Sequence, residues 1–371
     1  MENQTTTNIF SSLRHNGLEL KNRIVMAPMT RSRAIGTLPN ELMAKYYSQR
    51  SSAGLIIAEG TSPSPNGLGY ARIPGIYSEE QTEGWKIITQ AVHKKGSKIF
   101  LQLMHTGRIS HPSNMPENAE ILAPSAISAV GKMWTDSQGM QDHPEPKAMS
   151  LADIQQVIEE FTQAAKNAIR AGFDGVEIHG ANGYLVEQFI NPHSNQRDDQ
   201  YGGDMQNRLR FISEVTHAVV KAIGGEKVGV RMSPYNTFND MHAYESTPGT
   251  YLALTKEMKK LGILYIHVID AAAKGTEEGK KLLKDMRDNF GQLFMVNGGY
   301  SHKIADHTIS SGTADLVSFG VPFISNPDFP QRIQNNISLT PADSSLFYSA
   351  DEKGYTDYPF YDKVPQENNA F

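Results

Sequence analysis

The clearest unit of secondary structure runs from residue 150 to residue 185 and reads SLADIQQVIEEFTQAAKNAIRAGFDGVEIHGANGYL. It opens with an S-x-x-D pattern at Ser150 and Asp153, which is a capping signal for the start of a helix. Apolar residues then recur every three or four positions and predict one buried helix face: Ile154, Val157, Ile158, Phe161, Ala164, Ala165, Ala168 and Ile169. Gly172 can end this helix in a left-handed conformation. We therefore predict a helix over residues 151–171, followed by a buried strand over 175–180.

The same alternation of strand and helix patterns recurs along most of the chain. Eight short apolar runs predict strands at residues 24–29, 55–60, 98–103, 175–180, 227–232, 264–269, 293–298 and 316–321. A second clear helix is expected over residues 207–223. Strands that alternate with helices indicate a parallel sheet, and right-handed crossovers close eight such units most naturally into a barrel. We predict an α/β fold, a (β/α)8 TIM barrel that takes up residues 1–371 as one domain; an open doubly wound sheet is the alternative.

Two segments do not follow this alternation. Residues 110–149, between the third and fourth predicted strands, are rich in proline and show little periodicity. Long segments of this kind inside compact domains are usually functional, so we expect a lid insertion over one mouth of the barrel. Residues 340–371 are rich in aromatic side chains. This C-terminal segment either folds back over the barrel, as we expect, or forms a loose tail.

The composition excludes several classes of protein. The 371 residues carry 35 Lys and Arg against 40 Asp and Glu, without a basic stripe suited to nucleic acid or an anionic membrane. The absence of cysteine excludes disulfides, a thiolate nucleophile and cysteine-ligated iron–sulfur or zinc sites. The histidines do not have metal-ligand spacing. Since no apolar run approaches the roughly 18 residues of a membrane span, we expect a cytoplasmic protein whose partners are small molecules.

The carboxyl ends of the predicted strands should carry the functional residues, as they do in enzymes with this architecture. The ends of the seventh and eighth strands are rich in glycine, which allows backbone N–H groups to approach an anion closely. The residues concerned are Gly298, Gly299, Phe319, Gly320 and Val321. These two ends predict a site for a phosphorylated ligand, although such glycines can also serve only to form tight turns.

Polar side chains gather at three other strand ends. His179, Asn182 and Tyr184 lie in one turn and offer two donors for a developing oxyanion together with a phenol that can supply a proton. A hydrogen-bonded structural role for the histidine is the alternative. Gln102 and Arg231 end buried strands and would suit a planar heterocycle with carbonyls and ring nitrogens. On composition alone, an ion pair of Arg231 with Glu59 or Glu177 is an equally good reading.

Seven motifs together closely resemble those of the old yellow enzymes, which are flavin-dependent ene reductases. They read APMTR at 27–31, QLMHTGR at 102–108, HGANGYL at 179–185, NQR at 195–197, DQYGG at 199–203, SNPD at 325–328 and GYTDYP at 354–359. The similarity extends from about residue 9 to residue 360, which is nearly the whole chain. The resemblance supports the prediction of a single barrel.

The resemblance implies a non-covalent FMN, reduced by NADPH or NADH, which passes hydride to the C=C bond of an α,β-unsaturated carbonyl or nitro compound in a ping-pong cycle. By resemblance, the flavin ring is bound by Pro28, Met29, Thr30, Gly60, Gln102 and Arg231. The phosphate loops correspond to Gly298, Gly299, Phe319, Gly320 and Val321. By resemblance, His179 and Asn182 bind the substrate oxygen and Tyr184 supplies the proton. Tyr70 and Tyr355 line the substrate pocket.

Two positions depart from the family pattern. Val321 stands where members usually have the arginine that clamps the FMN phosphate, and Met104 stands where many have tryptophan. The first departure predicts weaker retention of FMN, because a charge-assisted hydrogen bond is lost. The second predicts a softer pocket wall. The alternative function is a flavin-free barrel that binds small molecules and has lost catalysis.

Overall fold

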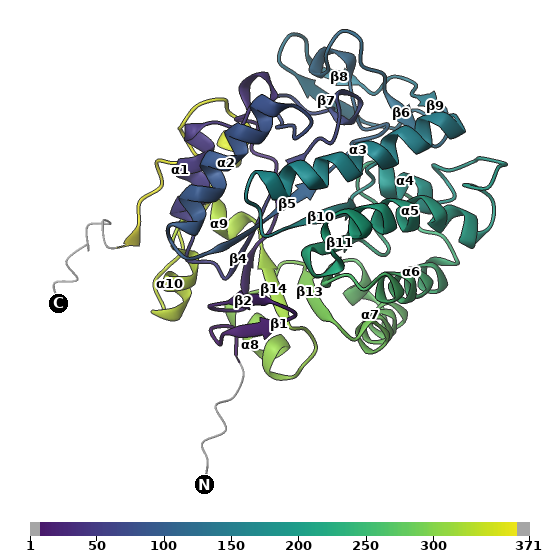
Figure 1. Cartoon of the computed structure of the whole chain (residues 1–371). Coiled ribbons are helices and arrows are strands. Elements are labelled where there is room, and N and C mark those ends of the chain that lie inside the picture. Colours follow the sequence, from purple (N-terminus) through teal and green to yellow (C-terminus); the bar gives the residue numbers. More distant parts are fainter. Residues whose placement is uncertain (1–7, 362–371) are drawn as a thin grey trace, which may run out of the picture.

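The protein is a closed barrel of eight parallel strands surrounded by helices (Figure 1). The computed structural model describes residues 8–361. Around the barrel the strands follow the order β10-β11-β12-β13-β14-β3-β4-β5. Their bounds are β3 (Ile24–Met26), β4 (Leu55–Thr61), β5 (Lys98–Leu103), β10 (Gly175–Gly180), β11 (Val228–Met232), β12 (Tyr265–Ile269), β13 (Leu293–Asn297) and β14 (Leu316–Phe319). The predicted (β/α)8 barrel is confirmed. Strand β3 is shorter than predicted, since Pro28 has no N–H to continue the ladder.

Helices connect the strands and cover the outside of the barrel (Figure 1). They are α1 (Glu41–Gln49), α2 (Glu79–His93), α3 (Leu151–Arg170), α4 (Leu185–Ile190), α5 (Met205–Ile223), α6 (Thr247–Leu261), α7 (Glu277–Phe290), α8 (His302–Ser310), α9 (Val321–Ser325) and α10 (Phe329–Gln334). The predicted cap of α3 forms: Ser150 Oγ accepts from Asp153 N at 3.1 Å, and Asp153 Oδ2 accepts from Ser150 N at 2.8 Å. Among the described helices, none combines the length and the apolar composition that crossing a bilayer requires.

The interior of the barrel is closed at the amino ends of the strands and open at the carboxyl ends. A hairpin of β1 (Leu13–His15) and β2 (Leu18–Leu20) packs beneath the barrel. Its three leucines share one apolar cluster with inward-facing side chains of the strands: Val25, Leu55, Ile57, Phe100, Tyr265, Leu293, Met295 and Leu316. Polar groups and a cavity can therefore be accommodated only near the opposite mouth, where the loops after the strands lie.

The insertion between β5 and α3 contains short strand pairs that lie beside one end of the barrel (Figure 1). The antiparallel pair consists of β7 (Lys132–Thr135) and β8 (Gly139–Asp142), and the parallel pair of β6 (Leu122–Ala123) and β9 (Lys147–Ala148). Met133 is buried, whereas Trp134 and Met140 are each 53% exposed. The hairpin of β7 and β8 thus presents large apolar side chains to the space above the barrel, where Trp134 and Met140 line a cavity.

The C-terminal segment packs against the loop that follows β3. Arg31 and Arg33 donate to main-chain carbonyls of this segment, with Arg31 Nη2 2.8 Å from the oxygen of Gly354 and Arg33 Nη2 3.0 Å from that of Lys353. The ring of Tyr355 stacks on that of Tyr46 in α1, with centroids 4.0 Å apart. The described part of the segment, up to residue 361, thus folds back on the barrel; the prediction for 362–371 lies outside the described residues.

Candidate functional site

A cavity of about 790 Å³ opens at the carboxyl ends of the barrel strands. Its lining brings together eight of the residues that the sequence singled out: Pro28, Thr30, Tyr70, Gln102, His179, Asn182, Tyr184 and Arg231. These residues come from the loops after β3 and β4, from β5 and β11, and from the end of β10 with the turn that follows it. The volume lies within the range typical of sites for small organic ligands and cofactors.

His179 offers one proton donor to this cavity. Its Nδ1 atom accepts a hydrogen bond from the N–H of Ala181 at 3.3 Å, so in the neutral ring the proton is on Nε2. Burial lowers the pKa of His179 well below its ordinary value, and the nearby charges of Arg231 and His267 add to this effect. The ring is therefore a neutral donor at physiological pH, suited to an oxygen on which negative charge develops.

Tyr184 places a phenol beside this donor. The rings of His179 and Tyr184 lie edge to face with centroids 4.9 Å apart, and the Tyr184 hydroxyl donates to that of Tyr70 at 3.0 Å. Burial raises the pKa of Tyr184 well above its ordinary value, and the proximity of Tyr70 raises it further. The phenol is thus kept protonated, as a proton donor must be. Asn182 lies in the same turn and also lines the cavity.

Gln102 is oriented by a buried polar network in the barrel. Its Nε2 donates to Glu177 Oε1 at 2.8 Å, and Glu177 Oε2 lies 2.9 Å from His267 Nδ1. Burial raises the pKa of Glu177, but the charge and hydrogen bond of His267, with Arg231 and Gln102, outweigh burial and bring it below the ordinary value. One of the two N–H groups of the Gln102 amide is used by this carboxylate, and its carbonyl oxygen can accept from a ligand.

Arg231 has an unused donor in the same region. Its Nη2 donates to Asn297 Oδ1 at 3.2 Å, while its buried Nε has no hydrogen-bond partner within residues 8–361. Within the described residues, Arg231 forms no ion pair with Glu59 or Glu177, so that alternative is wrong. It bonds to Asn297, and Glu177 is paired with His267. A buried donor without a partner carries a free-energy cost, which a bound ligand would remove. Gln102 and Arg231 together fit the acceptor and donor edge of an isoalloxazine ring.

The glycine-rich ends of β13 and β14 lie next to each other at the same mouth. The two strands are paired, and Asn297 Nδ2 donates to the carbonyl of Ser318 at 3.0 Å. Gly299 has φ +74°, a conformation that other residues rarely adopt. Met29 lies beside Gly320, with its Sδ 3.4 Å from where a Cβ at Gly320 would be. Phe319 is buried, whereas Val321, the first residue of α9, is 55% exposed.

A cation that the sequence did not indicate, Lys274, lies beside these loops. Lys274 follows β12, and its Nζ is 3.2 Å from the carbonyl oxygen of Gly298 and 3.1 Å from Asp270 Oδ1. A Cβ at Gly298 would lie 2.1 Å from the same Asp270 oxygen, so the position is restricted to glycine by this carboxylate. Because Lys274 belongs to a turn without a distinctive pattern, only the pairing of β12 with β13 brings it here.

Eight of the sixteen predicted site residues are not among those that line the cavity. Six of them are Met29 and the residues at the ends of β13 and β14, described above; the other two are Tyr355 and Gly60. Tyr355 is fully buried behind the cavity wall, where it stacks on Tyr46 and lies under the guanidinium of Arg33 at 4.6 Å. Its ring is held there by packing, so it does not reach the cavity. Gly60 is covered by Met104: a Cβ at this glycine would lie 2.5 Å from the thioether sulfur. Met104 itself lines the cavity.

The outer part of the cavity is lined by residues from segments that have no periodic pattern. Trp134 and Met140 come from the insertion, Phe238 from the loop after β11, and Tyr348 from the C-terminal segment. Each of the four side chains is between 53% and 59% exposed. No sequence signal places them together, since their contacts are made across long separations in the chain.

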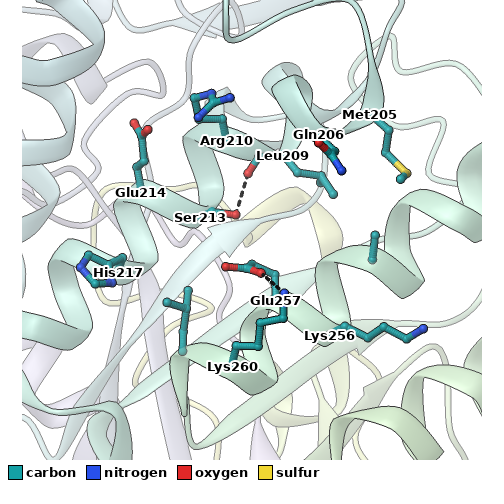
Figure 2. Close-up of a pocket in the computed structure, with 12 residues that line it drawn as sticks. Met205, Gln206, Leu209, Arg210, Ser213, Glu214, His217, Lys256, Glu257 and Lys260 are labelled. Atoms are coloured by element: carbon teal, nitrogen blue, oxygen red, sulfur yellow. Dashed lines mark hydrogen bonds and ion pairs between the residues drawn. The ribbon is translucent and has the colours of Figure 1, made fainter.

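A second cavity, of about 650 Å³, lies on the outside of the barrel between α5 and α6 (Figure 2). It shares no lining residue with the cavity at the barrel mouth. Figure 2 shows Ser213 bonded to the carbonyl of Leu209 and Lys260 paired with Glu257, at 2.8 and 3.1 Å respectively. Ser213, Lys260 and Glu257 are thus satisfied within their own helices.

Comparison with known proteins identifies the family. Residues 8–340 match the NADH:flavin oxidoreductase / NADH oxidase family. The chain is 42% identical to 12-oxophytodienoate reductase 1 of Oryza sativa subsp. japonica over 361 residues, which cover 95% of this chain and 93% of the relative. It is 40% identical to 12-oxophytodienoate reductase 7 of the same plant, with 97% and 96% covered.

Solved structures of similar sequence have the same fold over nearly the whole chain. Morphinone reductase superposes with a TM-score of 0.92 at 39% identity, with 97% of this chain and 98% of that chain covered. A structure of morphinone reductase in complex with tetrahydroNAD superposes with a TM-score of 0.91 at 40% identity, with 96% and 98% covered. Together with the cavity at the barrel mouth, these matches establish that the chain belongs to the NADH:flavin oxidoreductase family of old yellow enzymes and is an FMN-dependent oxidoreductase that takes its electrons from a reduced nicotinamide nucleotide.

Proposed function

We propose that this enzyme reduces the C=C bond of α,β-unsaturated carbonyl or nitro compounds. The observation that carries the proposal is the wall formed by His179, Asn182 and Tyr184, which adjoins Gln102 and Arg231 in one cavity. The relatives' names support the choice of substrate, because they describe reductases of 12-oxophytodienoate and of morphinone. An electron-poor alkene is therefore the expected acceptor; NADH or NADPH is the expected reductant, and the cytoplasm the expected location.

The chain's own residues would hold FMN at two places. Pro28, Thr30, Gln102 and Arg231 line the part of the cavity suited to the flavin ring. Gly298, Gly299, Phe319, Gly320 and Val321 lie at the neighbouring strand ends, where the phosphate would be bound. Met29, beside Gly320, would adjoin the flavin ring, and Gly60 supports Met104 at the wall. When bound there, FMN would supply the hydride-transfer chemistry between a reduced nicotinamide and the acceptor.

The remaining steps belong to side chains of the cavity. The Nε2 proton of His179 and the Asn182 side chain bind the carbonyl or nitro oxygen, on which negative charge accumulates during reduction. Tyr184 then gives its proton to the α-carbon. Tyr70, whose hydroxyl accepts from Tyr184 at 3.0 Å, keeps the phenol pointed along the wall. Removing a general acid of this kind typically slows a reaction about 100- to 10,000-fold.

The test is the substitution Tyr184→Phe in the FMN-loaded enzyme. We expect the reoxidation of reduced FMN by 2-cyclohexen-1-one to slow about 100-fold or more, because the proton donor is lost. Reduction of FMN by NADH should keep its rate, since that half-reaction needs no proton at the α-carbon. Stopped-flow absorbance of the flavin separates the two. Tyr348→Phe, which removes an exposed phenol at the cavity mouth, is the matched control; equal losses in both half-reactions of Tyr184→Phe would refute the role.

The alternative of a flavin-free binding barrel is not favoured by the match to a flavin oxidoreductase family. The first observation to make is the absorbance of the purified protein. We expect a yellow flavin spectrum that NADH bleaches and an enone restores. A colourless protein that takes up no FMN would favour the binding barrel instead.

A further inference from the structure

The turn that carries Asn182 and Tyr184 has a conformation that needs external support. Asn182 has φ +59° and Gly183 has φ +74°, so two successive residues are left-handed, and the first of them is not glycine. Such a conformation costs free energy and persists only where surrounding groups hold it. The question is which group of the protein does so.

Glu187, one turn further along in α4, receives hydrogen bonds from four directions. Its Oε2 accepts from the N–H of Gly183 at 2.6 Å and from Asn236 Nδ2 at 3.2 Å. Its Oε1 accepts from the hydroxyls of Ser233 and Tyr251, each at 2.8 Å. All four partners are donors, and an ionised carboxylate has about four acceptor positions. The side chain is 2% exposed, so water does not replace these partners.

One of the four donors, Ser233, also contacts Asn182, the residue proposed to bind the substrate oxygen. Ser233 Oγ, which gives its proton to Glu187, accepts from the N–H of Asn182 at 3.0 Å. Glu187 therefore reaches the backbone of both left-handed residues, directly at Gly183 and through Ser233 at Asn182. Because the Asn182 N–H can only donate, Ser233 Oγ must accept from it. The hydroxyl proton of Ser233 is then available for Glu187, so both hydrogen bonds are satisfied.

The same carboxylate joins two walls of the cavity. Asn236 and Ser233 belong to the loop after β11, and this loop carries Phe238, which lines the cavity. Asn239 of the loop donates through Nδ2 to the carbonyl of Asn182 at 2.8 Å. The carboxyl group of one buried side chain thus lies at the junction between the turn after β10, the loop after β11 and helix α6.

We propose that Glu187 is a positioning residue whose ionised carboxylate holds the turn 182–184 in the geometry that binds the substrate oxygen and delivers the Tyr184 proton. This inference rests on the proposed function. Glu187 does not touch the cavity, so its effect on the reaction passes through Asn182 and Tyr184. Burial raises the pKa of Glu187 to about 7, against hydrogen bonds that lower it, so the experiments belong at pH 8, where the carboxylate is ionised.

The test compares FMN-loaded wild type with Glu187→Gln and Ser233→Ala. In Glu187→Gln the amide NH₂ faces two of the four donors and cannot accept from them. We expect amide hydrogen exchange to accelerate in residues 181–186 and 233–239 and to stay unchanged in α3. The kcat/KM for 2-cyclohexen-1-one should fall about 100-fold, the loss typical of a misplaced group, and the dissociation constant of cyclohexanone should rise at least about tenfold. FMN affinity and the reduction potential should be unchanged.

The matched control is Glu214→Gln on α5, which removes a carboxylate that accepts from Tyr201 at 2.7 Å on the outer groove (Figure 2). It should leave all these quantities unchanged. The proposal would be overturned if local exchange in Glu187→Gln matched wild type, or if exchange became faster while kcat/KM and cyclohexanone affinity stayed unchanged. General loss of FMN and of exchange protection in Glu187→Gln would also overturn it. If wild type reduces no enone, the proposed function fails, while exchange and cyclohexanone affinity still decide whether Glu187 holds a binding turn.

Discussion

At the scale of single residues, the site depends on where protons are held. The Ala181 N–H directs the His179 proton to Nε2, and burial keeps both this ring and the Tyr184 phenol neutral. A neutral imidazole with its proton on Nε2 can donate a hydrogen bond to an oxygen. A neutral phenol still holds the proton that it gives to a carbon. The sequence indicated these residues, but their protonation follows from contacts that only the folded chain provides.

Val321 allows a prediction about cofactor affinity. The side chain is 55% exposed at the start of α9, beside the ends of β13 and β14, and has no charge to offer a phosphate. We expect Val321→Arg to tighten FMN binding roughly tenfold to a hundredfold, because a charge-assisted hydrogen bond contributes about 1.5 to 3 kcal/mol. Fluorescence titration of the apoprotein with FMN measures the dissociation constant. Riboflavin, which has no phosphate, is the control ligand and should bind equally to both proteins; unchanged FMN affinity would show that another cation already fills this role.

At the scale of elements, the sequence predicted what depends on local patterns. The helix expected over 151–171 is observed as Leu151–Arg170, and the helix expected over 207–223 as Met205–Ile223. The eight strands were found because buried parallel strands consist of continuous apolar runs. The insertion was recognised only as an irregular segment, since the pairing of β7 with β8 is carried by a few residues. That Met133 is buried and Trp134 faces the cavity depends on tertiary contacts alone.

The cap of α3 provides a prediction at this scale. Ser150 Oγ accepts from the N–H of Asp153 at 3.1 Å, and the Asp153 carboxylate accepts from the N–H of Ser150. Ser150→Ala removes the first of these bonds, and we expect it to lower the free energy of unfolding by about 1 kcal/mol. Urea denaturation followed by circular dichroism gives this difference. Ser310→Ala, at the exposed end of α8, should change it by less than about 0.5 kcal/mol; equal effects of the two substitutions would contradict the capping role.

At the scale of the whole molecule, segments from the two ends of the chain meet beside the cavity. Arg31, in the loop after β3, donates to Tyr46 in α1 and to the carbonyl of Gly354. The C-terminal segment supplies Tyr348 to the cavity mouth while Tyr355 anchors it from behind. The family motif at 354–359 suggested a substrate contact for Tyr355, but nothing in its sequence indicates the partner, because Tyr46 lies 309 positions earlier. The stacking of the two rings is a property of the closed barrel.

Glu59 lies at this junction and gives the stability of the protein a dependence on pH. It is fully buried, accepts from the Tyr47 hydroxyl at 3.0 Å, and burial raises its pKa to about 7, although Tyr47 and Arg31 lower it. An unfolded glutamate has an ordinary pKa near 4.3. Between these two values the folded state binds the proton more tightly, so the contribution of Glu59 to stability is present below the lower value and is lost as the pH rises through about 7.

Glu59→Gln isolates this contribution, since the amide cannot titrate. We expect the free energy of unfolding of wild type, measured relative to the variant, to fall by about 1 to 3 kcal/mol between pH 5 and pH 8. Comparing the two proteins at each pH cancels the histidines, which titrate in both. Glu257→Gln, an exposed carboxylate paired with Lys260 on α6, is the control and should follow wild type at both pH values. A difference that stays constant from pH 5 to pH 8 would mean that Glu59 is already ionised throughout this range, held so by Arg31 and Tyr47 despite its burial.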